Sequence, residues 1–221
     1  RSSDLTELLF LERETAPNEA EQRAAYQAVI DGLDGRSAII RTLDVGADKS
    51  LPYIPMPEEE NPALGLRGIR LCIARQALLV EQLRAILAVQ PLSAVKIMLP
   101  MVVDASEIVA TRVVLDRLTA EMGIAGRVEL GVMIETPSAA ILADQLAKEA
   151  DFFSVGTNDL TQYALCMDRT NPALAARVDG LHPAVLRLRE GLILGGVRAP
   201  LPASCKATEP PPQPEPMITT S

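Results

Sequence analysis

Short apolar stretches recur along the chain and alternate with longer segments of mixed polarity. The short stretches are rich in Val, Ile, Leu and Phe and have the length of buried strands. They cover residues 7–11, 37–43, 94–102, 128–135 and 151–157. We expect a strand at each of them.

The segments between several of these strands begin with helix-start signals. Asn18 followed by Glu21, and Asp104 followed by Glu107, match the capping box. Thr136 stands before a proline, a residue that is favoured in the first helical turn. The expected helices cover residues 18–33, 104–123 and 136–150.

Continuous apolar strands that alternate with helices indicate an α/β fold, in which helices cover a parallel sheet. In the first expected helix, Ala25, Val29 and Leu33 fall on one face, as in an amphipathic helix. Sheets of this kind carry their chemistry at the carboxyl ends of the strands, whether they are open or closed into a barrel. The polar residues at those ends are therefore the candidates for a site.

Two carboxylates, Glu135 and Asp159, follow neighbouring expected strands and would project toward the same edge. Mg²⁺ typically takes one or two protein carboxylates and completes its shell with water and phosphate oxygens, so this pair suits Mg²⁺. Arg41, Arg67 and Arg169 could clamp phosphate oxygens through their guanidinium forks. A single strand-end carboxylate is more often a helix cap or a salt-bridge partner, and only the coincidence of several favours a site.

Composition narrows the class of protein. The chain has 221 residues, 48% of them hydrophobic, which is enough to bury a core. Its net charge of -8 argues against a nucleic-acid partner. No apolar run reaches the ~20 residues that span a bilayer, and the first residues do not read as a signal peptide, so we expect no membrane insertion and a cytoplasmic location.

Several single residues are expected to have structural roles. Cys72, Cys166 and Cys205 lack metal-ligand spacing and are expected to be reduced thiols. His182, the one histidine of the sequence, precedes a proline at an expected helix entry and is expected to have a structural or capping role.

Five segments in order resemble one family. They are residues 41–53, 58–70, 97–102, 131–140 and 151–172, the last of which contains Gly-Thr-Asn-Asp. Together they resemble the phosphoenolpyruvate (PEP)-binding domain of Enzyme I of the sugar phosphotransferase system, the phosphoenolpyruvate-protein phosphotransferase. The resemblance implies a (β/α)₈ TIM barrel of the PEP/pyruvate-binding type, incomplete in this chain, with about five or six strands.

The family's chemistry implies a function and partners. Enzyme I transfers the phosphoryl group of PEP, with Mg²⁺, to a histidine on a separate swivelling domain, and then to the histidine-containing phosphocarrier protein. This is the first step of sugar uptake and phosphorylation, and the full-length family forms homodimers. The motifs carry over metal ligation to Glu135 and Asp159, phosphate stabilisation in catalysis and substrate binding to Arg41, Asn158 and Arg169, and further substrate binding to Arg67.

The sequence also departs from the family. Leu5 stands where the family has an arginine, and Ala47 replaces a glycine beside the phosphate. The family's Gly-x-Cys-Gly-Glu strand, whose cysteine is the proton donor, does not occur, and Cys205 lacks its glycine frame. We expect residues 1–190 to form a partial barrel domain and residues 191–221 a proline-rich, non-homologous, disordered tail. The chain reads as a fragment cut at both ends, inactive by itself and either marginally stable or self-associating.

Two alternatives stay open. Pyruvate phosphate dikinase and PEP synthase share the Gly-Thr-Asn-Asp segment, although residues 41–53 and 58–70 favour Enzyme I and a nucleotide-binding domain is absent. The other alternative is a PEP-binding or dimerisation module without turnover, which the missing cysteine strand and Leu5 favour.

Overall fold

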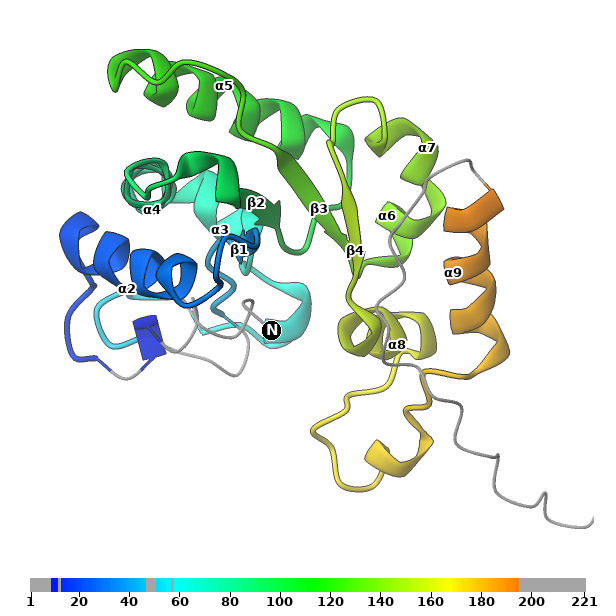
Figure 1. Cartoon of the computed structure of the whole chain (residues 1–221). Coiled ribbons are helices and arrows are strands. Elements are labelled where there is room, and N and C mark those ends of the chain that lie inside the picture. Colours follow the sequence, from blue (N-terminus) through cyan, green and yellow to red (C-terminus); the bar gives the residue numbers. More distant parts are fainter. Residues whose placement is uncertain (1–8, 12, 47–50, 57, 195–221) are drawn as a thin grey trace, which may run out of the picture.

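Four parallel strands form the sheet of the computed structural model, which describes residues 9–11, 13–46, 51–56 and 58–194 (Figure 1). The strands pair in chain order, β1-β2-β3-β4. The register sets Arg41 beside Met98 and Ile134 beside Val155. The predicted parallel α/β sheet is therefore confirmed. The strands are β1 (Ala38–Arg41), β2 (Val95–Leu99), β3 (Leu130–Ile134) and β4 (Phe153–Val155).

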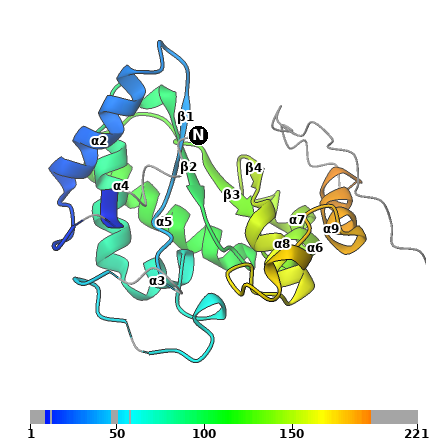
Figure 2. The ribbon, with the colours of Figure 1, turned by 90° about the horizontal axis from the view of Figure 1, so that it is seen from below.

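Helices pack along the sheet in two groups. Seen from below, α2, α4 and α5 lie beside β1 and β2, while α6 to α9 lie on the β4 side of the sheet, with α9 outermost against α6 and α8 (Figure 2). The helices are α2 (Glu19–Asp31), α3 (Ile69–Ala74), α4 (Gln76–Leu87), α5 (Ala105–Glu121), α6 (Pro137–Ile141), α7 (Ala143–Leu146), α8 (Thr157–Leu165) and α9 (Pro183–Leu194). Short 3₁₀ helices lie at η1 (Pro62–Leu64), η2 (Leu92–Ala94) and η3 (Ala175–Arg177).

The predicted helix starts are confirmed. Glu21 N donates to Asn18 Oδ1 at 3.0 Å, and Asn18 N donates to the Glu21 carboxylate at 2.9 Å, which completes the capping box of α2. Asp104 and Glu107 form the same box at α5. Thr136 accepts a hydrogen bond from Ala139 N at the start of α6. One helix is predicted over residues 136–150, but the structure has two short helices there, α6 and α7, because the backbone leaves helical geometry at Leu142.

His182 caps α9, as its position before a proline predicts. Its Nδ1 accepts a hydrogen bond from Ala184 N at 3.2 Å. The helix runs on to Leu194, through the domain boundary predicted between residues 190 and 191. The tail from residue 195 onward lies outside the described residues, as do the departures at Leu5, Ala47 and Cys205.

The buried face of α2 is offset by one residue from the predicted face. Gln22, Tyr26 and Ile30 are buried, whereas the predicted face is only partly buried. A glutamine can take a core position here because its Nε2 donates to Pro17 O at 2.9 Å. An apolar pattern does not reveal such a polar member of a core face.

The strand predicted over residues 7–11 is not formed where the structure describes it, since residues 9–11 are helical. Short apolar runs fit a buried helical turn as well as a strand, and Phe10 buries its ring in the core either way. In the described ranges the sheet thus has four strands rather than five or six. The fold is a parallel half-barrel that does not close in these ranges, where β1 and β4 each pair on one side only, and this is consistent with the incomplete barrel that the family resemblance implies.

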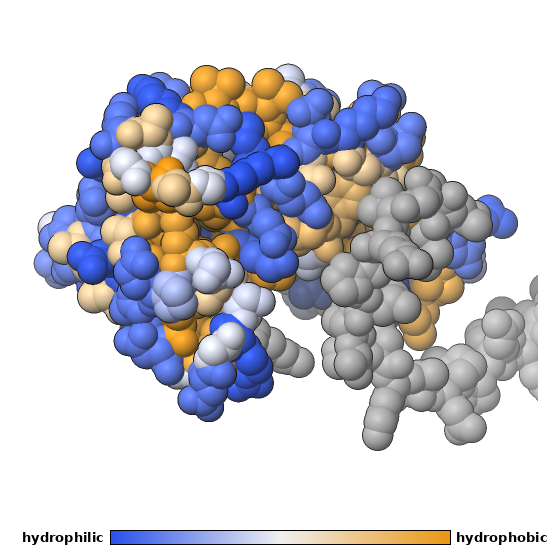
Figure 3. Space-filling model, turned by 45° about the horizontal axis from the view of Figure 1, so that its top comes forward, coloured by the Kyte–Doolittle hydropathy of each residue, from blue (hydrophilic) through white to orange (hydrophobic). Residues whose placement is uncertain are grey.

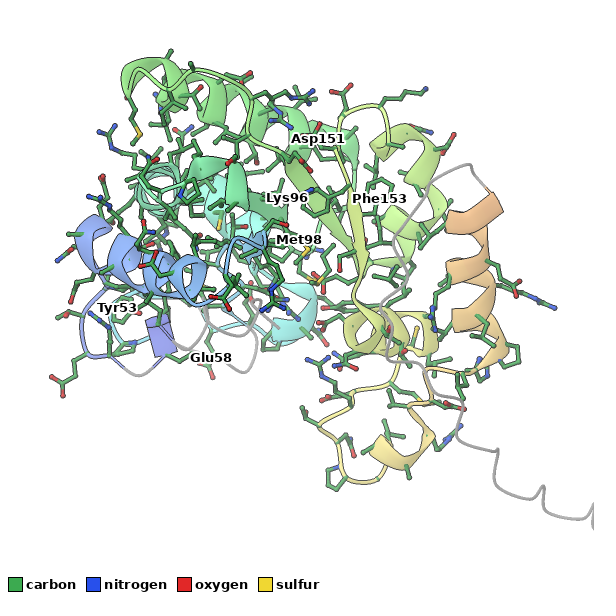
Figure 4. The ribbon with its side chains drawn as sticks, viewed as in Figure 1. Tyr53, Glu58, Lys96, Met98, Asp151 and Phe153 are labelled. Atoms are coloured by element: carbon green, nitrogen blue, oxygen red, sulfur yellow. The ribbon has the colours of Figure 1, made fainter. Side chains whose placement is uncertain are left out.

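Asp151 links several elements at the amino-terminal end of the sheet. At the amino-terminal end, Asp151 accepts hydrogen bonds from Arg112 at 2.6 Å and from Leu130 N at 2.8 Å, and it pairs with Arg127 at 2.9 Å. Figure 4 shows Asp151 at this end and Met98 nearer the carboxyl ends. Asp151 thus holds α5, β3 and β4 together at the amino-terminal end, away from the side chains predicted to form the site.

On the face that Figure 3 shows, hydrophilic residues cover much of the surface and hydrophobic patches lie between them. Exposed large apolar side chains include Val113 of α5 and Ile141 of α6. None of the helices in the described ranges combines the length and the apolar character needed to cross a membrane.

Candidate functional site

Five of the six predicted site residues meet at the carboxyl ends of the strands. Arg41 is the last residue of β1, and Glu135 follows β3 directly. Asp159 lies in the first turn of α8, which follows β4, and Arg67 lies just before α3. Arg169, in the turn after α8, reaches back to Asp159.

Arg67 lies at the centre of this cluster. Its Nε and Nη2 donate to the two oxygens of Asp44 at 3.2 and 3.0 Å, a bidentate pair. Its Nη1 donates to Tyr163 Oη at 3.2 Å and lies 3.5 Å from Asp159 Oδ1. Burial by itself would lower the pKa of Arg67, but the charge of Asp44, hydrogen bonds to it and the charge of Asp159 raise the pKa above its ordinary value. The guanidinium is therefore a fixed positive charge.

The backbone beside Arg67 needs a glycine. Gly68 has a φ of +57°, and a Cβ there would lie 2.7 Å from Met101 Cβ and 3.3 Å from Asp44 Oδ1. Both the positive φ and the close approach exclude other residues. Gly68 thus allows the backbone beside Arg67 to lie close to Asp44, so that Arg67 can donate two hydrogen bonds to the Asp44 carboxylate.

Glu135 is a buried carboxylate, 1% exposed. Its Oε1 accepts a hydrogen bond from Met101 N at 2.7 Å. Burial, and then the negative charges of Asp44 and Asp159, raise the pKa of Glu135 to about 8. Gly156 adds to the packing, because a Cβ at that position would lie 2.7 Å from Glu135 Oε2. Three carboxylates thus lie close enough to influence each other in a buried place.

Asp159 is held less tightly than Asp44. Its Oδ1 lies 3.5 Å from Arg67 and 3.4 Å from Arg169. Both distances exceed those of strong charge-assisted hydrogen bonds, about 2.7–2.9 Å. The carboxylate also lies in the first turn of α8, where the helix dipole favours negative charge. Asp159 can therefore exchange these contacts for a cation.

Arg41 and Arg169 flank the centre. Arg41 is buried, with its Nη1 3.7 Å from Asp44 Oδ2 and 3.6 Å from Met133 Sδ. The Arg169 side chain is 39% exposed, and its backbone N–H donates to Gln162 at 3.2 Å. One arginine is thus fixed inside the site and the other lies at its rim.

Asn158 is the predicted site residue that the structure does not bring into the cluster. It precedes Asp159 on α8, and consecutive helical residues point about 100° apart. Asn158 is exposed and lines a separate cavity of about 190 Å³ together with Thr157, Thr161 and Arg169. Arg169 connects the two places, because it also pairs with Asp159.

The cluster also contains residues for which the sequence predicted no role. Asp44 lies three residues after the end of β1, and only the fold shows that both its oxygens hold Arg67. Tyr163 donates to Ala63 O and accepts from Arg67, and burial, the largest effect on it, raises the pKa of its hydroxyl. The spacing of four residues between Asp159 and Tyr163 on one helix was a signal for their shared face.

The donor set fits Mg²⁺. The described residues contain no group of three or more His, Cys, Asp or Glu placed to hold a metal ion together. Mg²⁺ does not need such a group, since it usually takes one or two carboxylates with water and phosphate. Burial first, and then the negative charges of Asp44 and Asp159, raise the pKa of Glu135, and a cation beside Glu135 and Asp159 would offset both effects by favouring the ionised carboxylate. These two residues would therefore hold the ion.

Fold and cluster together define a parallel α/β protein with a buried site of arginines and carboxylates at the strand ends. A profile of the family described as "PEP-utilising enzyme, PEP-binding domain" matches residues 5–199. The chain therefore belongs to this family of PEP-binding domains. The match runs past the predicted domain boundary at residue 190, and that boundary stays a prediction.

Relatives in the family are phosphotransferases by name. The chain is 52% identical over 188 residues to the Multiphosphoryl transfer protein of Rhodobacter capsulatus, covering 85% of this chain and 23% of that protein. It is 48% identical over 188 residues to the Phosphoenolpyruvate-protein phosphotransferase of Listeria monocytogenes, covering 83% of this chain and 33% of that protein. The predicted resemblance to these phosphotransferases is confirmed. The chain spans about a quarter to a third of the length of these relatives.

Among solved structures, a citrate lyase from Burkholderia xenovorans matches with a TM-score of 0.43 and 22% identity, over 54% of this chain and 36% of that one. This likeness is too weak to bear on the site.

Proposed function

We propose that the strand-end site binds PEP and supports the Mg²⁺-dependent transfer of its phosphoryl group to a histidine on a separate domain. The observation that carries this proposal is the convergence of Arg41, Arg67 and Arg169 with the carboxylates Glu135 and Asp159 at one edge of the sheet. Phosphoryl transfer is catalysed mainly by positioning and by neutralising charge on the phosphoryl oxygens, and these groups are suited to both.

The three arginines would have different parts. Of the five N–H donors of a guanidinium, Arg67 uses four on Asp44, Asp159 and Tyr163. Arg67 therefore has little left to offer a phosphate, and it would contact the substrate through one edge. Arg41 inside the site and Arg169 at the rim are better placed to hold the phosphoryl oxygens between them.

Glu135 and Asp159 would hold the Mg²⁺ ion, which supplies positive charge at the phosphoryl oxygens when it is bound. Around it, the buried arginines and the helix dipole of α8 keep the local field favourable for an anion. The role of Asn158 in holding phosphate also stays a proposal, and it requires the substrate to extend toward the cavity that Asn158 and Arg169 line.

The reaction breaks the P–O bond of PEP and forms a P–N bond to the acceptor histidine. Enolpyruvate leaves as its enolate and takes up a proton to become pyruvate. Partners in this proposal are the swivelling domain and, after it, the histidine-containing phosphocarrier, in the first step of sugar uptake. Homodimerisation and a cytoplasmic location remain predictions beside it.

A second candidate is PEP binding without turnover. The sequence has no Gly-x-Cys-Gly-Glu segment to protonate the enolate, and this observation favours a binding module. The two candidates share the same site and differ only in whether the phosphoryl group moves.

Labelled PEP separates the two candidates. The chain is mixed with a separately produced swivelling domain, Mg²⁺ and PEP labelled in its phosphoryl group, and label on histidine is measured. We expect label that depends on both the chain and Mg²⁺, and a mixture without the chain is the control. Binding of PEP without any label on histidine would favour the second candidate, and the absence of binding would contradict both.

A further inference from the structure

The backbone at the end of β1 is held by buried side chains from two helices. Thr42 N donates to Met98 O in the last bond between β1 and β2. The next N–H, that of Leu43, donates instead to Gln82 Oε1 on α4 at 2.9 Å. The carbonyl of Leu43 accepts from the thiol of Cys72 on α3 at 3.6 Å. Both the N–H and the C=O of Leu43 are thus held by side chains where the sheet bonding stops.

Gln82 is itself fixed. It is 1% exposed, and its Nε2 donates to Tyr26 Oη at 3.1 Å. The Tyr26 hydroxyl donates to Gln22 Oε1 at 3.4 Å. The Nε2 of Gln22 in turn donates to Pro17 O at 2.9 Å. A glutamine that donates on one side and accepts on the other has a single amide orientation. A buried polar chain therefore runs from the start of α2 through α4 to the strand end.

Leu43 lies between two residues of the candidate site. Arg41 and Asp44 stand on either side of Leu43. Asp44 holds Arg67 with two bonds, so the direction in which the chain leaves Leu43 sets where the Arg67 guanidinium lies. Misplacing a binding group by about 1 Å is enough to cost up to about a hundredfold in function.

We propose that Gln82 is a positioning residue of the site: it fixes the Leu43 backbone and thereby aims Asp44 at Arg67. The bonds of Gln82 go to the Leu43 backbone and to Tyr26, so its effect on ligand is indirect. The inference rests on the proposed function, because it concerns the affinity of the same site for PEP.

Three variants of the whole chain test this inference by calorimetric titration with PEP and Mg²⁺. Gln82→Leu removes the acceptor of Leu43 N, and we expect PEP affinity to fall by about tenfold or more. Gln82→Glu keeps an oxygen at this place that can accept from Leu43 N, and its PEP affinity is expected to stay within about threefold of the native affinity. Gln22→Leu breaks the same buried chain at its far end, and we expect its affinity to stay within about twofold.

A purely structural role for Gln82 predicts a different pattern. Gln82→Leu and Gln22→Leu would then lower stability alike and leave PEP affinity equal at temperatures where both are folded. That result would overturn the inference. If Gln82→Leu does not fold, Gln82→Met, which keeps an unbranched side chain, takes its place.

A second readout does not need PEP. The Nε–H signal of Arg67 in the NMR spectrum reports its bond to Asp44. We expect this signal to shift or broaden in Gln82→Leu and to stay in place in Gln22→Leu. An unchanged signal in Gln82→Leu would refute the positioning role. If the native chain binds no PEP, the proposed function fails, while this signal still decides the role of Gln82.

Discussion

Replacing Arg67 with methionine is expected to weaken PEP binding at least about a hundredfold and to lower the free energy of unfolding by about 3 kcal/mol. Arg67 is 9% exposed and holds Asp44 with two bonds. Methionine fills much of the space but leaves the buried carboxylates of Asp44 and Asp159 without their shared cation. Binding suffers as well, because the same carboxylates would then repel an anionic substrate.

Urea unfolding and calorimetric titration with PEP measure the two effects of Arg67→Met. Arg117→Met is the matched control, since that side chain is 54% exposed and pairs only with Glu121 in the described contacts. We expect it to change stability by less than about 0.5 kcal/mol and to leave PEP affinity unchanged. Adding Asp44→Asn to Arg67→Met should restore part of the stability but none of the affinity. Native PEP affinity in Arg67→Met would show that the site is elsewhere.

Glu135→Gln is expected to stabilise the protein at pH 8 and to abolish its response to Mg²⁺. An unfolded chain releases the Glu135 proton near the ordinary pKa of 4.5, whereas the folded chain keeps it up to about 8. The folded state therefore binds more protons between these values, and the native protein loses stability as pH rises through this window. This cost is on the order of a few kcal/mol when complete, at and above about pH 8.

Glu135→Gln does not lose this stability as the pH rises, because glutamine does not ionise. Its amide oxygen can still accept the hydrogen bond from Met101 N. Urea unfolding of the native protein and of Glu135→Gln at pH 5 and pH 8 measures the effect. We expect the two to differ little at pH 5 and the variant to be the more stable at pH 8. Mg²⁺ should stabilise the native protein at pH 8 and not the variant, while Glu121→Gln, on the exposed side of α5, should behave as native. Equal pH profiles for native and Glu135→Gln would contradict the burial of a charged cluster.

Local patterns predicted most of the fold. Short segments of sequence are enough to show that apolar runs alternate with capped helices. Accordingly, β1 to β4 fall within the predicted ranges. The capping boxes at Asn18 and Asp104 depend on residues three apart, so the sequence suffices for them. Residues 9–11 show the limit, because whether a short apolar run becomes a strand depends on a neighbouring strand elsewhere in the chain.

The site was predictable only in part for the same reason. The carboxyl ends of the strands of a parallel sheet meet at one edge. This rule predicts that Arg41, Glu135 and Asp159 lie at the same edge, and the structure places them there. The pairing of Asp44 with Arg67 joins residues 23 apart, and no local pattern encodes it. Asn158 separates from Asp159 because β4 ends at Val155 and α8 already begins at Thr157, the last residue of the predicted strand, so that the two side chains leave a helix in different directions.

Calorimetric titration with PEP tests most directly whether this strand-end site binds PEP through its arginines and a carboxylate-held Mg²⁺. The native chain is titrated once with Mg²⁺ and once with chelator, and both titrations are repeated on Asp159→Ala. We predict binding that Mg²⁺ strengthens at least about tenfold in the native chain, and no Mg²⁺ effect in the variant, because one of two ligands is lost. PEP affinity that is the same with Mg²⁺ and with chelator, or a full Mg²⁺ effect in Asp159→Ala, would contradict this account.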